Sequence, residues 1–156
     1  MNVTTGVVLP LLIGVIAGLR AMTAPAAISL AARAGRLDLG TTRLAFLGYA
    51  YTPWIFAALA LVELVTDQLP TTPSRTVPIQ FGTRILMGGL TGGAIAATGA
   101  LAAGVIAGMV GAVIGTLGGR ALRGRLAAAL GSDRPAAVIE DLVALGGAFL
   151  IVQMLP

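Results

Sequence analysis

The stretch from Ile85 to Gly119 reads "ILMGGLTGGAIAATGALAAGVIAGMVGAVIGTLGG" and contains no charged residue. As one helix, its 35 residues would extend about 52 Å. Fitting that length into a bilayer core of about 30 Å needs a tilt of roughly 55°, which exceeds the usual range. We therefore expect two shorter helices that meet at a turn near Thr98–Gly99.

The composition places this stretch in a membrane protein. The chain has 156 residues, of which 57% are hydrophobic and 10% are charged, and its mean hydropathy is +0.97. Since a soluble domain carries about 25% charged residues, this chain has too few charges to cover a water-facing surface. We expect an all-α, multi-pass protein of the inner membrane, with the lipid bilayer as its partner and residues 1–156 forming a single transmembrane domain.

The whole chain is expected to form about five transmembrane helices, within a range of four to six. Three further hydrophobic stretches cover residues 5–32, 44–66 and 136–155. The first is interrupted, because Arg20 lies at its middle and Pro25 cannot donate a hydrogen bond to the carbonyl of Ala21. A kink or break is expected at Pro25, so the first and third hydrophobic segments are both interrupted or re-entrant.

The arginines indicate the orientation. With five spans, loops 67–84 and 120–134 share one side and carry six arginines, while loop 33–43 carries three on the other. The positive-inside rule then places the N-terminus in the cytoplasm and the C-terminus outside. With a single crossing at 85–119, the count is seven arginines against two, so this count favours four spans whereas helix length favours five.

Charge and residue usage exclude several classes of function. The formal charge is +4, but the basic residues are arginines in short loops, which is typical of membrane topology and predicts no nucleic-acid partner. The absence of Cys and His excludes thiol chemistry, thiolate or imidazole metal sites and histidine acid–base catalysis. We expect no metal, no cofactor and no enzymatic activity.

Glycines recur every three or four residues in the second half of 85–119. They are Gly104, Gly108, Gly111, Gly115 and Gly118. This spacing places them on one helix face, where small residues let helix backbones approach closely in lipid. The face could pack within one protomer, form the interface of a homo-oligomer, or line a pore.

Four carboxylates lie at membrane depth or near it. Glu63 and Asp67 are four residues apart and share a helix face, while Glu140 and Asp141 are adjacent and point about 100° apart. A charge at the bilayer centre costs at least about 2.5–3.5 kcal/mol, so these acids need partners or water.

Three arginines are the expected partners of these acids, namely Arg20, Arg75 and Arg84. The proline-rich segment 70–78, which contains Ser74, is expected to cover the resulting cluster. The cluster could fix helix register, form a water-filled site for a substrate or ion, or support acid–base chemistry, although nothing marks a nucleophile.

Three motifs carry a resemblance to a known family. They are "GLRAMTAP" at 18–25, "ELVTDQLPTTPSR" at 63–75 and "IEDLVA" at 139–144. In their order along nearly the whole chain, they resemble domain of unknown function family 4126, a group of small, mainly bacterial membrane proteins. The resemblance implies a polytopic membrane protein whose matching residues are Arg20, Pro25, Glu63, Asp67, Pro70, Pro73, Ser74, Arg75, Glu140 and Asp141. It implies no activity.

A short internal similarity gives a further clue. "ARAGRL" at 32–37 is similar to "ALRGRL" at 121–126, which suggests a weak repeat of residues 1–78 in 79–156. Paired interrupted segments are typical of transporters. We therefore expect a homo-oligomeric transporter or channel for a small solute or ion; the alternative is a structural or assembly protein whose buried charges only fix helix packing.

Overall fold

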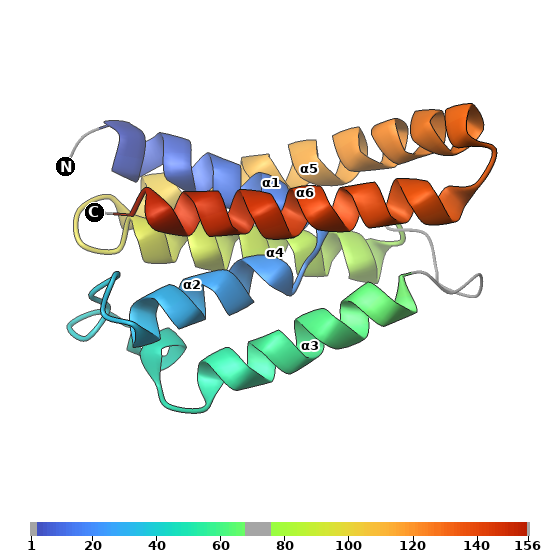
Figure 1. The fold of residues 1–156 in the computed structure, drawn as a ribbon. Coiled ribbons are helices and arrows are strands. Elements are labelled where there is room, and N and C mark those ends of the chain that lie inside the picture. The colour runs from blue at the N-terminus through green and yellow to red at the C-terminus, as the bar shows by residue number, and fades with distance from the viewer. Residues whose placement is uncertain (1–2, 68–75, 156) are drawn as a thin grey trace.

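The computed structural model describes residues 3–67 and 76–155, and the regular elements in these ranges are all helices (Figure 1). Six α-helices run in chain order: α1 (Leu9–Leu19), α2 (Thr23–Arg33), α3 (Thr52–Thr66), α4 (Pro78–Ile95), α5 (Leu101–Leu130) and α6 (Asp133–Gln153). A π-helical turn (Thr4–Val8) precedes α1, and a short 3-10 helix (Ala45–Gly48) precedes α3. The expectation of an all-helical fold is confirmed.

The first hydrophobic segment folds back on itself. Helix α1 runs in the same direction as α5, because Gly14 packs against Gly108 and, further along both helices, Gly18 packs against Ala112. Helix α2 runs in the opposite direction to α1 (Figure 1). The two helices therefore form a hairpin whose turn lies inside the molecule.

Contacts with α6 show the same reversal. Arg20, at the turn, contacts Asp141 near the start of α6, and Arg36, just beyond α2, donates a hydrogen bond to Gln153 at the end of α6. Helix α2 therefore runs parallel to α6. As a result, α1 begins and α6 ends at the same end of the molecule, which corrects the expectation of termini on opposite sides (Figure 1).

The break in the first segment lies before Pro25, so the prediction of a break at Pro25 is wrong in position. Helix α1 ends at Leu19, Arg20 is extended with φ −140° and ψ 109°, and α2 begins at Thr23. Pro25 is the third residue of α2. The first-turn N–H groups of a helix have no intrahelical partner, so a proline there removes no hydrogen bond.

The segment 85–119 forms two helices, as its length predicted. Helix α4 ends at Ile95 and α5 begins at Leu101, with turns between them around Thr98. Helix α5 continues to Leu130, however, where a loop had been expected from residue 120. Alanine, leucine and arginine favour helix, and the left-handed Gly131 with φ 69° then ends it.

Glycines bring α1, α4 and α5 into close contact. A Cβ added at Gly108 would lie 2.0 Å from the carbonyl oxygen of Gly88, and one at Gly111 would lie 2.1 Å from that of Leu11. Gly104 and Gly115 are also buried against neighbouring helices. Gly118 is not, because α1 has already ended at Leu19, and no atom lies within 4 Å of a Cβ added there.

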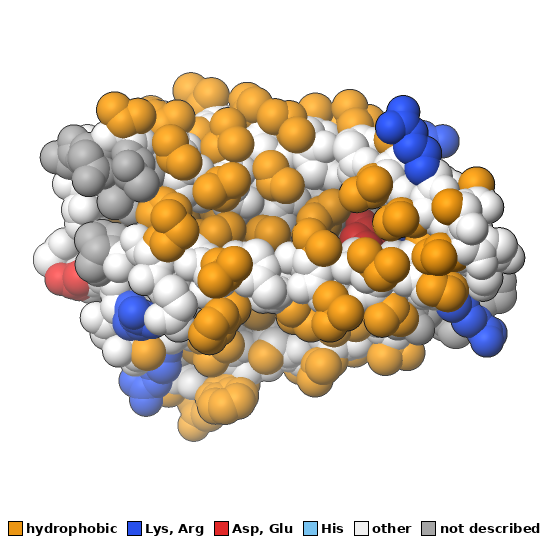
Figure 2. Space-filling view, turned by 45° about the horizontal axis from the view of Figure 1, so that its top comes forward, with side chains coloured by type: hydrophobic (Ala, Val, Ile, Leu, Met, Phe, Trp, Pro, Cys, Tyr) orange, Lys and Arg blue, Asp and Glu red, His pale blue; other side chains and the backbone are white. Residues whose placement is uncertain are grey.

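The outer surface of the bundle is apolar. Figure 2 shows hydrophobic side chains covering the long face of the molecule and arginine side chains gathered toward its two ends. Leu61, Leu142 and Phe149 are each more than 60% exposed. Two described helices, α5 and α6, are long and apolar enough to cross a membrane, while α1 and α3 are apolar but shorter.

Candidate functional site

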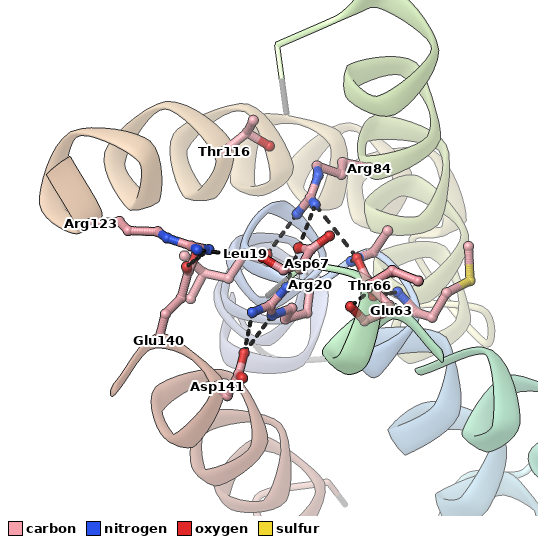
Figure 3. A network of polar contacts seen from close by, with 12 residues as sticks. Leu19, Arg20, Glu63, Thr66, Asp67, Arg84, Thr116, Arg123, Glu140 and Asp141 are labelled. Atoms are coloured by element: carbon pink, nitrogen blue, oxygen red, sulfur yellow. Dashed lines mark hydrogen bonds and ion pairs between the residues drawn. The ribbon is translucent and has the colours of Figure 1, made fainter. Parts of the chain in front are cut away.

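The turn between α1 and α2 leaves backbone groups without helical partners in the interior. The carbonyls of Gly18 and Leu19 lie at the C-terminal end of α1, and the N–H groups of Ala21 and Met22 lie at the start of α2. Such groups must be satisfied by side chains, water or a ligand. Two charged side chains from other helices do this (Figure 3).

Arg84 of α4 binds the end of α1. One terminal nitrogen of its guanidinium donates to the carbonyls of Gly18, at 2.9 Å, and Leu19, at 2.6 Å. The hydroxyl of Thr116 on α5 also donates to Gly18, at 3.2 Å. A cation is favourable here because the carbonyl end of a helix carries partial negative charge.

Glu63 of α3 binds the start of α2. Its Oε1 accepts a hydrogen bond from the N–H of Ala21, at 2.7 Å, and its Oε2 accepts one from Met22, at 2.8 Å. The anion therefore meets the positive end of α2. Because Arg84 lies 3.5 Å from Glu63, the two charges that hold the helix ends also pair with each other.

Arg20 joins two further acids at the turn itself. Its Nε donates to Oδ1 of Asp141, at 2.7 Å, and its guanidinium is also paired with Asp67. Asp67 lies 3.7 Å from Arg84 as well. The prediction that Arg20, Arg75 or Arg84 lies within ion-pair distance of an acid is therefore confirmed, through Arg20 and Arg84.

Arg123 of α5 is a member of the cluster that the sequence reasoning missed. Its guanidinium lies 3.5 Å from Glu140 and 2.5 Å from Asp133, and it donates to the backbone carbonyl of Asp67 at 3.4 Å. Residues 120–134 had been interpreted as a loop. The helix-forming composition of 120–130 was the signal that could have placed Arg123 on α5 facing the start of α6.

The predicted site residues in the described part of the chain come together. Glu140 and Asp141 point to different arginines, as their 100° separation required. Glu63 and Glu140 are joined through Asp67, which contacts Arg20, Arg84 and Arg123. Ser74, Arg75 and most of the proposed proline-rich cover lie outside the described residues.

Burial differs among the charged side chains of the cluster. The guanidinium side chains of Arg20 and Arg84 are 0% and 2% exposed, whereas the carboxylate side chains keep 6% to 12% of their surface. Figure 2 shows acidic surface in a recess surrounded by hydrophobic side chains. Arg123, at 15%, is also partly exposed, so the accessible charges of the cluster are the four acids and Arg123, whereas Arg20 and Arg84 are enclosed.

The next question is whether the acids of the cluster could hold a metal ion. Within residues 3–67 and 76–155, no group of three or more Asp, Glu, His or Cys side chains is arranged to hold a metal ion. The arrangement instead suits binding of charge, because two helix ends of opposite polarity meet carboxylates and guanidinium groups at one point.

Comparison with known proteins identifies a family and no activity. No curated protein and no solved structure matches the chain. A family model described as "Domain of unknown function (DUF4126)" matches residues 7–154, which is nearly the whole chain and includes every described member of the charged cluster. The chain therefore belongs to the DUF4126 family.

Proposed function

We propose that this protein is a multi-pass inner-membrane protein that moves a small solute or ion through the charged cluster at the α1–α2 turn. The observation that carries the proposal is the interrupted helix, whose two ends meet buried charges from α3 and α4. Discontinuous helices of this kind form the substrate and ion sites of many transporters, because helix ends hold opposite charges.

The surface supports the membrane placement. Apolar side chains cover the long face of the molecule and arginines lie toward its ends (Figure 2). Tyr49, Tyr51 and Trp54, near the start of α3, are each more than 60% exposed, as expected of side chains at a membrane interface. The end that carries the α5–α6 turn has more arginines, so it faces the cytoplasm.

The cluster offers a mechanism for coupling. Glu63 and Arg84 occupy the two helix ends where an anion and a cation are favoured, so each stands where a ligand of the same charge could bind. A proton on Glu63 would remove one charge from the Glu63–Arg84 pair and weaken the hold on the start of α2. Movement of α2 relative to α1 would then open the cluster to a solute.

A structural role is the second candidate, and one observation favours it. The helix ends at the turn already have partners within the protein, since Arg84 binds two carbonyls and Glu63 binds two N–H groups. A cluster with no need of a ligand would serve only to fix the hairpin against α3 and α4. The two candidates differ in whether a solute or ion crosses the membrane.

The test is a flux measurement in proteoliposomes. Proton entry, driven by a potassium diffusion potential, would be followed with a pH dye trapped inside, and sodium entry would be followed with a sodium dye. We expect wild-type flux of one of these ions, loss of that flux in Asp141→Asn, and no loss in Asp38→Asn, whose exposed acid lies in the 33–43 loop. Folded wild-type protein with neither flux would favour the structural role.

A further inference from the structure

A second feature lies away from the charged cluster, between the loop at 41–44, α4 and α5. It is an open groove of about 810 Å³. Its walls include Leu86, Val105 and Met109, and its floor includes Gly89. Gly89 packs closely against Met109, because a Cβ added there would lie 3.0 Å from the Met109 side chain.

The groove has one polar end. Thr42, Arg43 and Thr98 line it there, close to the turn between α4 and α5. Arg43 is exposed, and among residues 3–67 and 76–155 no hydrogen bond or ion pair engages its guanidinium. The arginines of the cluster, in contrast, are all paired with acids. Arg43 is therefore a cation at the mouth of an apolar groove.

We infer that this groove binds a phospholipid with an anionic headgroup, with its phosphate at Arg43 and an acyl chain between α4 and α5 over Gly89. A guanidinium binds phosphate with paired hydrogen bonds, and the exposed hydroxyl of Thr98 supplies a further donor, whereas that of Thr42 already donates to the Leu39 carbonyl. The apolar walls fit a hydrocarbon chain. The inference rests on the membrane placement proposed above and is independent of transport.

The expected selectivity follows from the single arginine. A basic residue near a membrane surface contributes attraction to an anionic lipid that corresponds to about fivefold in affinity. Because the walls and floor are apolar, they should hold the acyl chain of either lipid. Loss of Arg43 should therefore remove the headgroup preference and leave acyl-chain binding.

The experiment is native mass spectrometry of the full chain in detergent, with equimolar phosphatidylglycerol and phosphatidylcholine. The wild type should retain phosphatidylglycerol about fivefold over phosphatidylcholine. Arg43→Gln should retain the two lipids equally, while Arg33→Gln, an exposed arginine near the same end and outside the groove, should keep the preference. Leu86→Trp should reduce binding of both lipids; it should fold, because Leu86 is 65% exposed.

Two results would overturn the inference: equal retention of both lipids by the wild type, or a preference that survives Arg43→Gln. Carbonate washing of cell membranes tests the placement separately. A chain released by that wash would contradict the membrane placement itself. A chain that stays in the membrane, conducts no ion and still prefers phosphatidylglycerol would contradict only the transport proposal.

Discussion

At the scale of single residues, the break between α1 and α2 depends on Glu63 and Arg84, which form the hydrogen bonds that water would otherwise form with the backbone groups at the break. In an apolar interior, an unsatisfied backbone N–H or C=O costs several kcal/mol. Glu63 satisfies two N–H groups and Arg84 satisfies two carbonyls. The two acids of the i,i+4 pair therefore have different partners. Glu63 accepts hydrogen bonds from the backbone, whereas Asp67 pairs with Arg20.

Removal of the Glu63 carboxylate should be costly. Glu63→Ala leaves the N–H groups of Ala21 and Met22 without their acceptor, so we expect a loss of about 1–3 kcal/mol for each buried donor. Asp133→Ala is the matched control, because Asp133 is 62% exposed and a surface pair contributes about 0–1 kcal/mol. Unfolding in detergent, followed by circular dichroism, measures both; equal losses would contradict the role of Glu63.

Arg20 provides a second test at this scale. Arg20→Met leaves Asp67 and Asp141 buried beside an apolar side chain and should cost about 3–5 kcal/mol. The triple variant Arg20→Met, Asp67→Asn, Asp141→Asn removes the charges together and should recover much of that loss. A triple variant with a lower melting temperature than Arg20→Met would show that the loss of stability does not come from unpaired acids.

Sequence reasoning predicted the ion pairs but not the backbone contacts. The need of buried acids for partners follows from residue type and depth, so Arg20 and Arg84 could be named. The bonds from Glu63 to Ala21 and Met22 could not, because they require the position of the break, which was expected at Pro25. Arg123 was missed because its segment was interpreted as a loop.

At the scale of elements, the bundle is held by close helix contacts at glycine. Helices α1 and α4 both approach α5 so closely that a methyl group would overlap backbone atoms. In lipid, such packing replaces the hydrophobic effect as the force between helices. The spacing predicted a glycine face, but its end was set by the length of α1, which leaves Gly118 open.

Two alanine substitutions on α5 test this packing. Gly108→Ala would place a Cβ 2.0 Å from the Gly88 carbonyl oxygen and should destabilise by about 1–3 kcal/mol or more, because the clash is with backbone. Gly118→Ala meets open space and should stabilise by about 0.5–1 kcal/mol through helix propensity. The melting temperature in detergent measures the difference. Equal shifts would contradict the packing.

Helix boundaries were predicted well where they followed from the length of a hydrophobic segment, and poorly where they were inferred from a single residue. The 35 residues of 85–119 cannot cross a bilayer as one ordinary helix, and they form two. The prediction of a break at Pro25 was wrong because proline breaks a helix in its interior but is tolerated in its first turn. The end of α5 was placed too early because hydropathy fades at Arg120 while helix propensity does not.

At the scale of the whole molecule, the hairpin changes the topology. The first hydrophobic segment folds back on itself, because α2 runs opposite to α1 (Figure 1), and α5 and α6 are the described helices long and apolar enough to cross a membrane. The sequence predicted that the first segment was interrupted or re-entrant, and the opposite directions of α1 and α2 agree with the second of these alternatives. That reversal depends on charges from α3, α4 and α6 that meet at the turn.

The measurement that tests the hairpin most directly is cysteine labelling. The chain has no cysteine, so single cysteines at Val3, Thr41 and Ser132 can each be probed with an impermeant maleimide in right-side-out and inside-out membrane vesicles. The account predicts labelling of Val3→Cys and Thr41→Cys from the same, outer side and of Ser132→Cys from the cytoplasmic side. Labelling of Val3→Cys and Thr41→Cys from opposite sides would contradict it, because the first segment would then cross the membrane.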